Sequence, residues 1–257
     1  MLSVSFLVLA SMSGAFARTP QGFEPAVENS LVVSFGSVAA MDGNVLAKAS
    51  TQTAPTIGTQ SKLDGTSFAV VMVDLDIPTN SPPQTNTLLH WLQTNLTQST
   101  SATAVNTTAG SMDVFTLQTS QQAAFADYIG PSPPARTPLS HRYTQLLIDT
   151  SSATTQDLSV LQSAAATRMG FNANTVLTQA GLVDKVIAAN FFNVTNPGPV
   201  EAATNSSTGS GSGSSRGTGS VTSPTQSSTP LPGAAASQKA SELLVAIGLV
   251  GAAFFAL

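Results

Sequence analysis

Residues 68–78 run Phe-Ala-Val-Val-Met-Val-Asp-Leu-Asp-Ile-Pro, and this stretch decides which kind of fold the chain can adopt. Its first part, Phe68 to Val73, is a continuous apolar run with three valines that ends abruptly at Asp74 and Asp76. Short apolar runs rich in β-branched residues are typical of strands buried on both faces. We therefore expect a central strand here, and strand alternation places the two carboxylates on one face of it.

Three further segments have the composition of strands, and clusters of Gly, Pro and Asn separate them. The predicted strands span Leu88–Leu96, His141–Asp149 and Lys185–Val194. Together with the first strand they predict a mainly β fold.

Two helices are expected between the last two strands. Thr154 and Asp157 have the spacing of a capping box. Apolar residues then recur at helical intervals, at Leu158, Leu161, Ala165 and Met169. A shorter helix is expected from Asn174, as its N-cap, to Ala180, and Gly181 is free to adopt the left-handed conformation after it.

The chain has two histidines, so any imidazole chemistry must use His90, His141 or both. His141 opens the tripeptide His141-Arg142-Tyr143, in which strand alternation places His141 and Tyr143 on one face and Arg142 on the other. His90 lies among apolar residues, and a lone histidine in such a position is more often a satisfied core residue than a ligand. The interpretation of either histidine therefore depends on its neighbours.

Four short elements, in this order along the chain, resemble motifs of the phosphatidylethanolamine-binding protein family. They are Val73-Asp74-Leu75-Asp76-Ile77-Pro78, Leu89-His90-Trp91-Leu92, Tyr128-Ile129-Gly130-Pro131-Ser132-Pro133-Pro134 and His141-Arg142-Tyr143. Both histidines fall on family histidines, and four ordered elements are far more specific than one short motif. The segment from Phe171 to Phe192 is also similar to the helix-then-strand ending of the family. The resemblance implies antiparallel β-sheets with a few short helices, one of them late in the chain.

The resemblance also implies a small anion pocket. By position, its lining residues are Asp74, His90, His141 and Tyr143. By position, its rim is shaped by Gly130, Pro133 and Pro134. Protonated imidazoles and a phenol donate hydrogen bonds to phosphate-like groups, and a neighbouring carboxylate raises the pKa of a histidine and orients its ring.

Three residues near this pocket have structural interpretations. Arg142 points away from the pocket face and is expected to pair with a carboxylate beneath it. Asp76 is either that partner or the cap of a turn, because acids at strand ends commonly bind loop amides. Pro78 belongs to the same element. Departures from the family pattern lie at the pocket mouth, at Leu75, Ser132 and residues 137–140.

The two ends of the chain have features of targeting segments. Residues 1–17 resemble a secretory signal peptide, because an apolar stretch precedes the cleavage pattern Ala15-Phe16-Ala17. The final fifteen residues form an apolar run, shorter than the roughly 20 residues that a spanning helix needs. Small residues from Gly233 onward and a polar spacer precede this run, which is the order of a GPI attachment signal over residues 233–257. Gly233 is the expected attachment residue.

Between these ends we expect one domain and one linker. Residues 201–232 are nearly all Ser, Thr, Gly and Pro, which predicts a disordered and O-glycosylated stalk. Residues 19–200 are expected to form a single domain. The expected location is the extracellular face of the plasma membrane, with the cell wall as the alternative. N-glycosylation sequons begin at Asn95, Asn106, Asn193 and Asn205.

Composition excludes several classes of function. The chain has no cysteine, so it has no disulfides and no thiolate metal site, and we expect no cofactor. The net charge is −4 and there is no basic run, so nucleic acid is not an expected partner.

The leading hypothesis is a cell-surface binding module for an anionic small molecule or a phospholipid head group. One alternative is a protein-binding domain that inhibits an extracellular protease, and another is a structural surface protein with a vestigial pocket. A third alternative is an enzyme that uses Asp74, His90 and His141 for hydrolysis. However, the chain has no G-x-S-x-G element, and these residues do not make a complete set of catalytic groups. We therefore expect a protein that is not an enzyme.

Overall fold

A computed structural model describes residues 18–41, 43–119 and 122–198. Its strands are Val32–Phe35 (β1), Val38–Ala40 (β2), Val45–Leu46 (β3), Thr56–Thr59 (β4), Phe68–Pro78 (β5), Thr85–Gln98 (β6), Thr103–Thr107 (β7), Gly110–Thr119 (β8), Ser140–Asp149 (β9) and Val186–Thr195 (β10). Its helices are Thr155–Ala165 (α1) and Ala173–Gln179 (α2), with 3-10 turns at Lys48–Thr51 (η1) and Val183–Lys185 (η2). The mainly β fold with helices late in the chain is confirmed.

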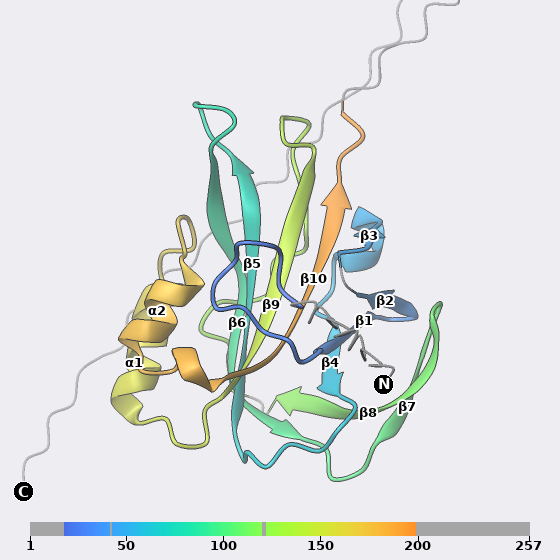
Figure 1. The fold of residues 1–257 in the computed structure, drawn as a ribbon, viewed down its shortest axis with the longest axis vertical. Coiled ribbons are helices and arrows are strands. Elements are labelled where there is room, and N and C mark those ends of the chain that lie inside the picture. The colour runs from blue at the N-terminus through green and yellow to red at the C-terminus, as the bar shows by residue number, and fades with distance from the viewer. Residues whose placement is uncertain (1–17, 42, 120–121, 199–257) are drawn as a thin grey trace, which may run out of the picture. The chain divides into compact units, whose positions relative to one another are not determined.

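The strands form one hydrogen-bonded system in the order β2-β1-β4-β8-β6-β5-β9-β10-β3, with β7 paired to β8 (Figure 1). Its centre is antiparallel, because β5 pairs with both β6 and β9, and β9 pairs with β10. Residues Phe68 to Val73 are buried throughout, as expected of a strand covered on both faces. The three other predicted strands coincide with β6, β9 and β10 to within three residues at each end.

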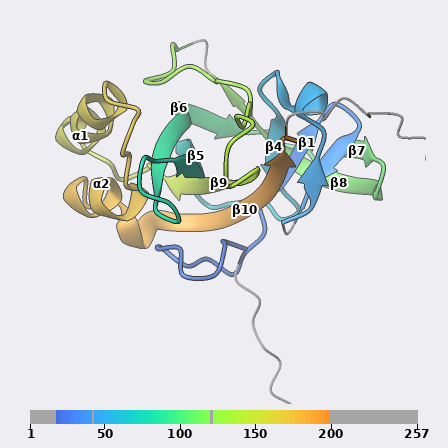
Figure 2. The ribbon, with the colours of Figure 1, turned by 90° about the horizontal axis from the view of Figure 1, so that it is seen from above.

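The two faces of the central sheet have separate cores (Figure 2). On one face, Leu161 of α1 and Leu177 of α2 pack against sheet residues such as Val71. On the other, Val33 of β1 and Ile57 of β4 pack against a cluster that contains Met72 and Phe192. The burial of each such side chain stabilises the fold by about 1.5–3 kcal/mol.

The first helix begins as the sequence predicts. Thr154 Oγ1 accepts a hydrogen bond from the Asp157 backbone N–H, and the Asp157 carboxylate accepts one from the Thr154 N–H. The prediction that Met169 continues the buried face is wrong, because α1 ends at Ala165 and Met169 is 51% exposed.

The second helix begins two residues earlier than predicted. Its N-cap is Asn172, whose side-chain oxygen accepts from the Thr175 N–H, so the assignment of Asn174 as N-cap is wrong. Asparagine is a good N-cap in general, and composition alone cannot choose between two asparagines two residues apart. Gly181 has a φ of 65°, as expected after the helix end.

Several predictions fall outside the described residues. These are the signal peptide (1–17), the stalk (201–232), the sequon at Asn205 and the attachment residue Gly233. Within the described residues, none of the helices has the length and apolar character needed to cross a membrane.

Candidate functional site

A β-bulge in β6 aims His90 at the site. In the pairing of β5 with β6, Met72 lies opposite Trp91 and Val73 lies opposite Leu89, so His90 is the extra residue. Bulges commonly redirect a side chain next to a functional site. Strand alternation alone could not place His90, because the bulge depends on the partner strand.

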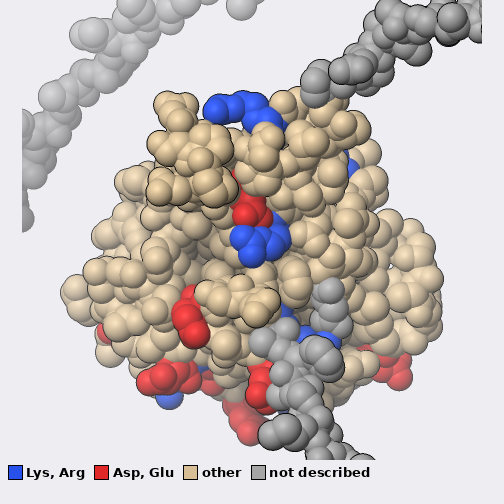
Figure 3. All heavy atoms as spheres, turned by 45° about the horizontal axis from the view of Figure 1, so that its top comes forward, with Lys and Arg blue, Asp and Glu red and all other residues tan. Residues whose placement is uncertain are grey.

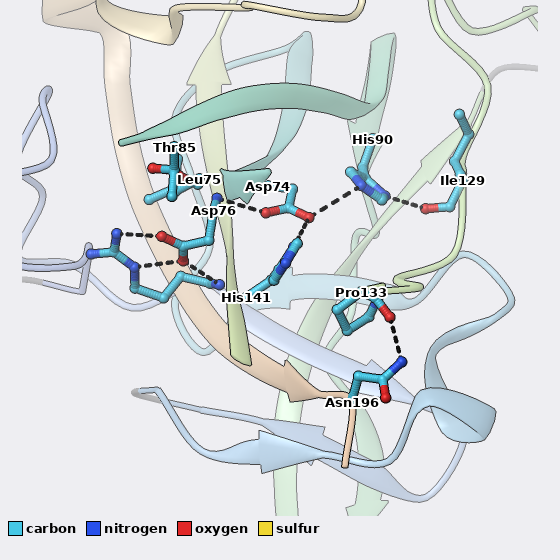
Figure 4. Close-up of polar contacts among 10 residues, drawn as sticks. Asp74, Leu75, Asp76, Thr85, His90, Ile129, Pro133, His141 and Asn196 are labelled. Carbon is cyan, nitrogen blue, oxygen red and sulfur yellow. Dashed lines mark hydrogen bonds and ion pairs between the residues drawn. The ribbon is translucent and has the colours of Figure 1, made fainter. Parts of the chain in front are cut away.

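A second irregularity separates the roles of the two acids on β5. Asp74 lies opposite Leu88 and Ile77 lies opposite Asn86, so the β5–β6 register shifts between them. The two carboxylates have different partners, His141 for Asp74 and Arg142 for Asp76. Figure 4 shows the Asp74 carboxylate directed toward the histidines and the Asp76 carboxylate directed away from them.

Asp74 holds His141 in place through one short hydrogen bond. The His141 Nδ1–H donates to Asp74 Oδ2 at 2.8 Å, and Asp74 Oδ1 accepts the Asp76 backbone N–H at 2.8 Å (Figure 4). Asp74 is 1% exposed and His141 is 0% exposed. Because the carboxylate fixes the proton on Nδ1, the Nε2 atom of His141 is the one that faces a possible ligand.

His90 lies across Asp74 from His141 and is held by a hydrogen bond to the backbone of Ile129. Its Nδ1–H donates to the Ile129 carbonyl at 2.7 Å, and its Nε2 lies 3.9 Å from Asp74 Oδ2. Burial lowers the pKa of His90, while the Ile129 hydrogen bond and the Asp74 charge act in the opposite direction and the positive charges of Arg168 and His141 lower it further. His90 is therefore neutral at neutral pH.

This lowered pKa makes stability depend on pH. Below the unfolded-state pKa of about 6.5 the unfolded chain binds a proton that folded His90 does not, so the unfolding free energy falls as the pH falls. The control variant is His90→Gln, which keeps an N–H for the Ile129 carbonyl. Between about pH 7 and 5, the unfolding free energy measured with urea should fall more steeply for the wild type than for this variant. Parallel losses in the two proteins would contradict this.

One buried polar atom in the site, His141 Nε2, has no hydrogen-bond partner among the described residues. The hydroxyl of Tyr143, a residue that is 0% exposed, lies near the Asp74 carboxylate and the Ser132 backbone. The Tyr143 ring meets the His90 ring edge-on at 5.1 Å and stacks on Phe192 at 5.5 Å, so its position is fixed. Burial raises the pKa of Tyr143, and the charge of Asp74 adds to this, so the hydroxyl stays protonated and is a donor.

The loop at residues 128–134 closes over this cluster and is tied at several points. The Tyr128 hydroxyl donates to the Thr51 carbonyl at 2.8 Å, and Asn196 Nδ2 donates to the Pro133 carbonyl at 2.8 Å. Gln52 Nε2 donates to the Pro131 carbonyl at 2.9 Å. The predicted rim residues have different exposures, since Pro133 is buried, Gly130 is partly exposed and Pro134 is exposed.

Gly130 is needed where this loop meets η1. A Cβ atom at this position would lie 2.9 Å from the Cα atom of Gln52, closer than real contacts allow. The chain thus approaches itself closely at the rim, and the site residues beneath are almost completely buried. The implied pocket is closed in this structure.

Arg142 pairs with Asp76, which settles the two alternatives left by the sequence. Its Nε and backbone N–H donate to Asp76 Oδ2 and its Nη2 donates to Oδ1, each at 2.8 Å. These hydrogen bonds raise the pKa of Arg142, so its guanidinium stays charged at neutral pH. The Arg142 side chain is 42% exposed. Pro78 ends β5 nearby. Acidic and basic side chains touch within an otherwise uncharged region of this surface (Figure 3).

The described sequon residues differ in accessibility. Asn106 is exposed on β7. Asn95 is partly buried, has a φ of 56° and contacts Gln122 through its side-chain amide. Asn193 is also partly buried, and its amide donates to the Gly43 carbonyl. Sugar attachment at Asn95 or Asn193 would break these contacts.

The sequence reasoning missed the residues that hold the rim. Gln52 and Asn196 are isolated polar residues in loops, and nothing in their neighbourhood distinguishes them from other exposed amides. The Ile129 carbonyl is a backbone group that any residue would supply. Within the described residues, no group of three or more acidic or histidine side chains is arranged to hold a metal ion.

Comparison with protein-family models identifies one family. The family model described as "PBP: Phosphatidylethanolamine-binding protein" matches residues 36–192. The chain is 27% identical over 202 residues to "Phomoidride biosynthesis cluster protein N" of Talaromyces stipitatus, a match that covers 73% of this chain and 94% of that protein.

Two solved structures are similar to the chain at lower sequence identity. A carboxypeptidase Y inhibitor in complex with its cognate proteinase is 18% identical, with 66% of this chain and 85% of that chain covered and a TM-score of 0.46. A phosphatidylethanolamine-binding protein of Plasmodium vivax is 18% identical, with 68% and 91% covered and a TM-score of 0.46.

Proposed function

Because the chain belongs to the phosphatidylethanolamine-binding protein family, we propose that it is a binding protein whose buried site accepts a small anionic group. The group is a phosphate, either free or in a phospholipid head group. The observation that carries this proposal is the buried His141 Nε2 atom, which has no hydrogen-bond partner within the described residues and lies beside the buried Tyr143 side chain. A buried polar atom without a partner costs about 1–3 kcal/mol, and a ligand that satisfies this atom recovers this energy.

The two side chains suit a phosphate in a specific way. The Tyr143 hydroxyl donates to a phosphate oxygen. His141 Nε2 faces the same ligand, because Asp74 holds the other ring nitrogen, Nδ1, at 2.8 Å.

Entry of an anion requires the loop at residues 128–134 to move. The ties to Thr51 and Gln52 on one side and to Asn196 on the other are single hydrogen bonds to backbone carbonyls, and Ile129 makes two further hydrogen bonds with His90. Each contributes about 0.5–1.5 kcal/mol, so the closed loop can open without unfolding the sheet beneath it.

We further propose that the protein acts at the outer cell surface, held by a GPI anchor. The support is in the sequence: small residues from Gly233 onward, a polar spacer and a terminal apolar run occur in the order that attachment requires.

The histidine ring signals in NMR test the anion site directly, because the protein has only two histidines. Titration with phosphate, phosphoethanolamine and acetate should give saturable shifts of both rings. Tyr143→Phe should weaken phosphate binding about 10-fold or more, since a hydrogen bond to a charged group contributes about 1.5–3 kcal/mol. Phosphate and phosphoethanolamine together separate the free ion from the head group.

The control is Thr103→Val, which removes an exposed hydroxyl from β7, far from the site in the sheet order. It should leave phosphate affinity unchanged. If neither ring responds to any of the three anions, the anion-site proposal fails, and capture of an extracellular protease becomes the leading hypothesis.

A further inference from the structure

A hollow of 460 Å³ lies beside the short pairing of β6 with β8. The two strands pair only through Leu96, Thr97 and Gln98 of β6, and the segment 54–57 forms the facing wall. Small-molecule sites in proteins typically have volumes of about 300–1,000 Å³. The hollow is therefore large enough for a ligand of its own.

The lining of this hollow is uncharged. Its floor consists of Ile57, Trp91, Leu96 and Leu117, each at most 8% exposed. The remaining lining residues are alanine, proline, threonines and a glutamine, with no acidic, basic or histidine side chain among them. A charged ligand would lose hydration here without gaining a counter-ion, which is costly, whereas an apolar group buries surface favourably.

We propose that this hollow binds a neutral, mainly apolar small molecule, namely a medium-length alkyl chain with an uncharged polar end. The chain lies on the floor around Trp91, and the polar end meets the hydroxyl of Thr119, which lies on the same face of β8 as Leu117. This ligand class follows from the chemistry of the lining and does not depend on the anion site.

The hollow shares a wall with the anion site. Trp91 follows His90 in the chain, and its ring meets Tyr128 edge-on at 5.9 Å. Tyr128 in turn precedes Ile129, whose carbonyl accepts the His90 hydrogen bond. Trp91 therefore lies between this hollow and the loop that closes the anion site.

Trp91 is the only tryptophan in the chain, so the tryptophan fluorescence of the protein comes from the floor of this hollow. We would titrate the full-length protein with 1-octanol, below its solubility limit, and with octanoate at neutral pH. Octanol should shift the emission saturably, and octanoate should bind at least about 10-fold more weakly because of its unpaired charge. Equal affinities would overturn the assignment of a neutral ligand.

A pair of neighbouring substitutions tests the location. Ala54→Phe places a ring at the exposed edge of the hollow and should weaken octanol binding about 10-fold or more. Thr53→Phe adds the same ring one residue away, at an exposed position outside the lining, and should leave binding unchanged. The proposal is overturned if octanol gives no saturable change, or if Ala54→Phe binds octanol as the wild type does.

Discussion

Replacing Phe192 by alanine is expected to lower the unfolding free energy by about 3–5 kcal/mol. Phe192 is 0% exposed, stacks on Tyr143 at 5.5 Å and meets Phe35 edge-on at 5.3 Å. It lies opposite Tyr143 in the pairing of β9 with β10, so the packed sheet can only partly fill the cavity that the truncation leaves. The loss therefore includes both the transfer energy of the ring and the cost of that cavity.

The matched control is Phe191→Ala, one residue earlier on the same strand. Phe191 is only partly buried, so its truncation removes less apolar surface from the core and should cost clearly less. Urea unfolding of both variants measures the difference. Equal losses would show that Phe192 has no special role in the core beneath the site.

The strands were predictable because burial imposes a local pattern on them. The apolar run at Phe68–Val73 is buried on both faces, and the segment from His141 to Asp149 is the same strand in the structure to within one residue. The bulge at His90 was not predictable, because a bulge depends on which residue lies opposite. The different partners of Asp74 and Asp76 were not predictable either, because they depend on which side chains β9 brings next to them.

The composition of the site was predictable from the resemblance, but its closure was not. The structure brings together Asp74, His90, His141 and Tyr143, as the resemblance implies. The loop that covers them is held by Gln52, which is 79 residues away from its partner Pro131 in the chain. No sequence pattern relates the Gln52 amide to this loop. Long-range ties of this kind depend on the folded backbone, so sequence spacing carries no information about them.

Replacing Asp74 by alanine is expected to lower the unfolding free energy by about 2–5 kcal/mol. Asp74 accepts two buried hydrogen bonds, from the Asp76 N–H and from His141 Nδ1–H, each at 2.8 Å. Without the carboxylate both donors are buried and unpaired, and each such donor costs about 1–3 kcal/mol. His141 also loses the group that fixes its proton on Nδ1, so phosphate binding should be lost together with stability.

The comparison that isolates this effect is Asp76→Ala, two residues along the same strand. Asp76 also accepts several hydrogen bonds, but its main partner, the Arg142 side chain, is 42% exposed and regains water when the carboxylate is removed. We expect a smaller loss of about 1–2 kcal/mol from this variant. Urea unfolding of the two variants, with phosphate titrations followed by the His141 ring signal, gives both quantities. If Asp76→Ala destabilised the protein as much as Asp74→Ala, the buried histidine pair would not be what makes Asp74 important, because burial of the partner is the main difference between the two carboxylates.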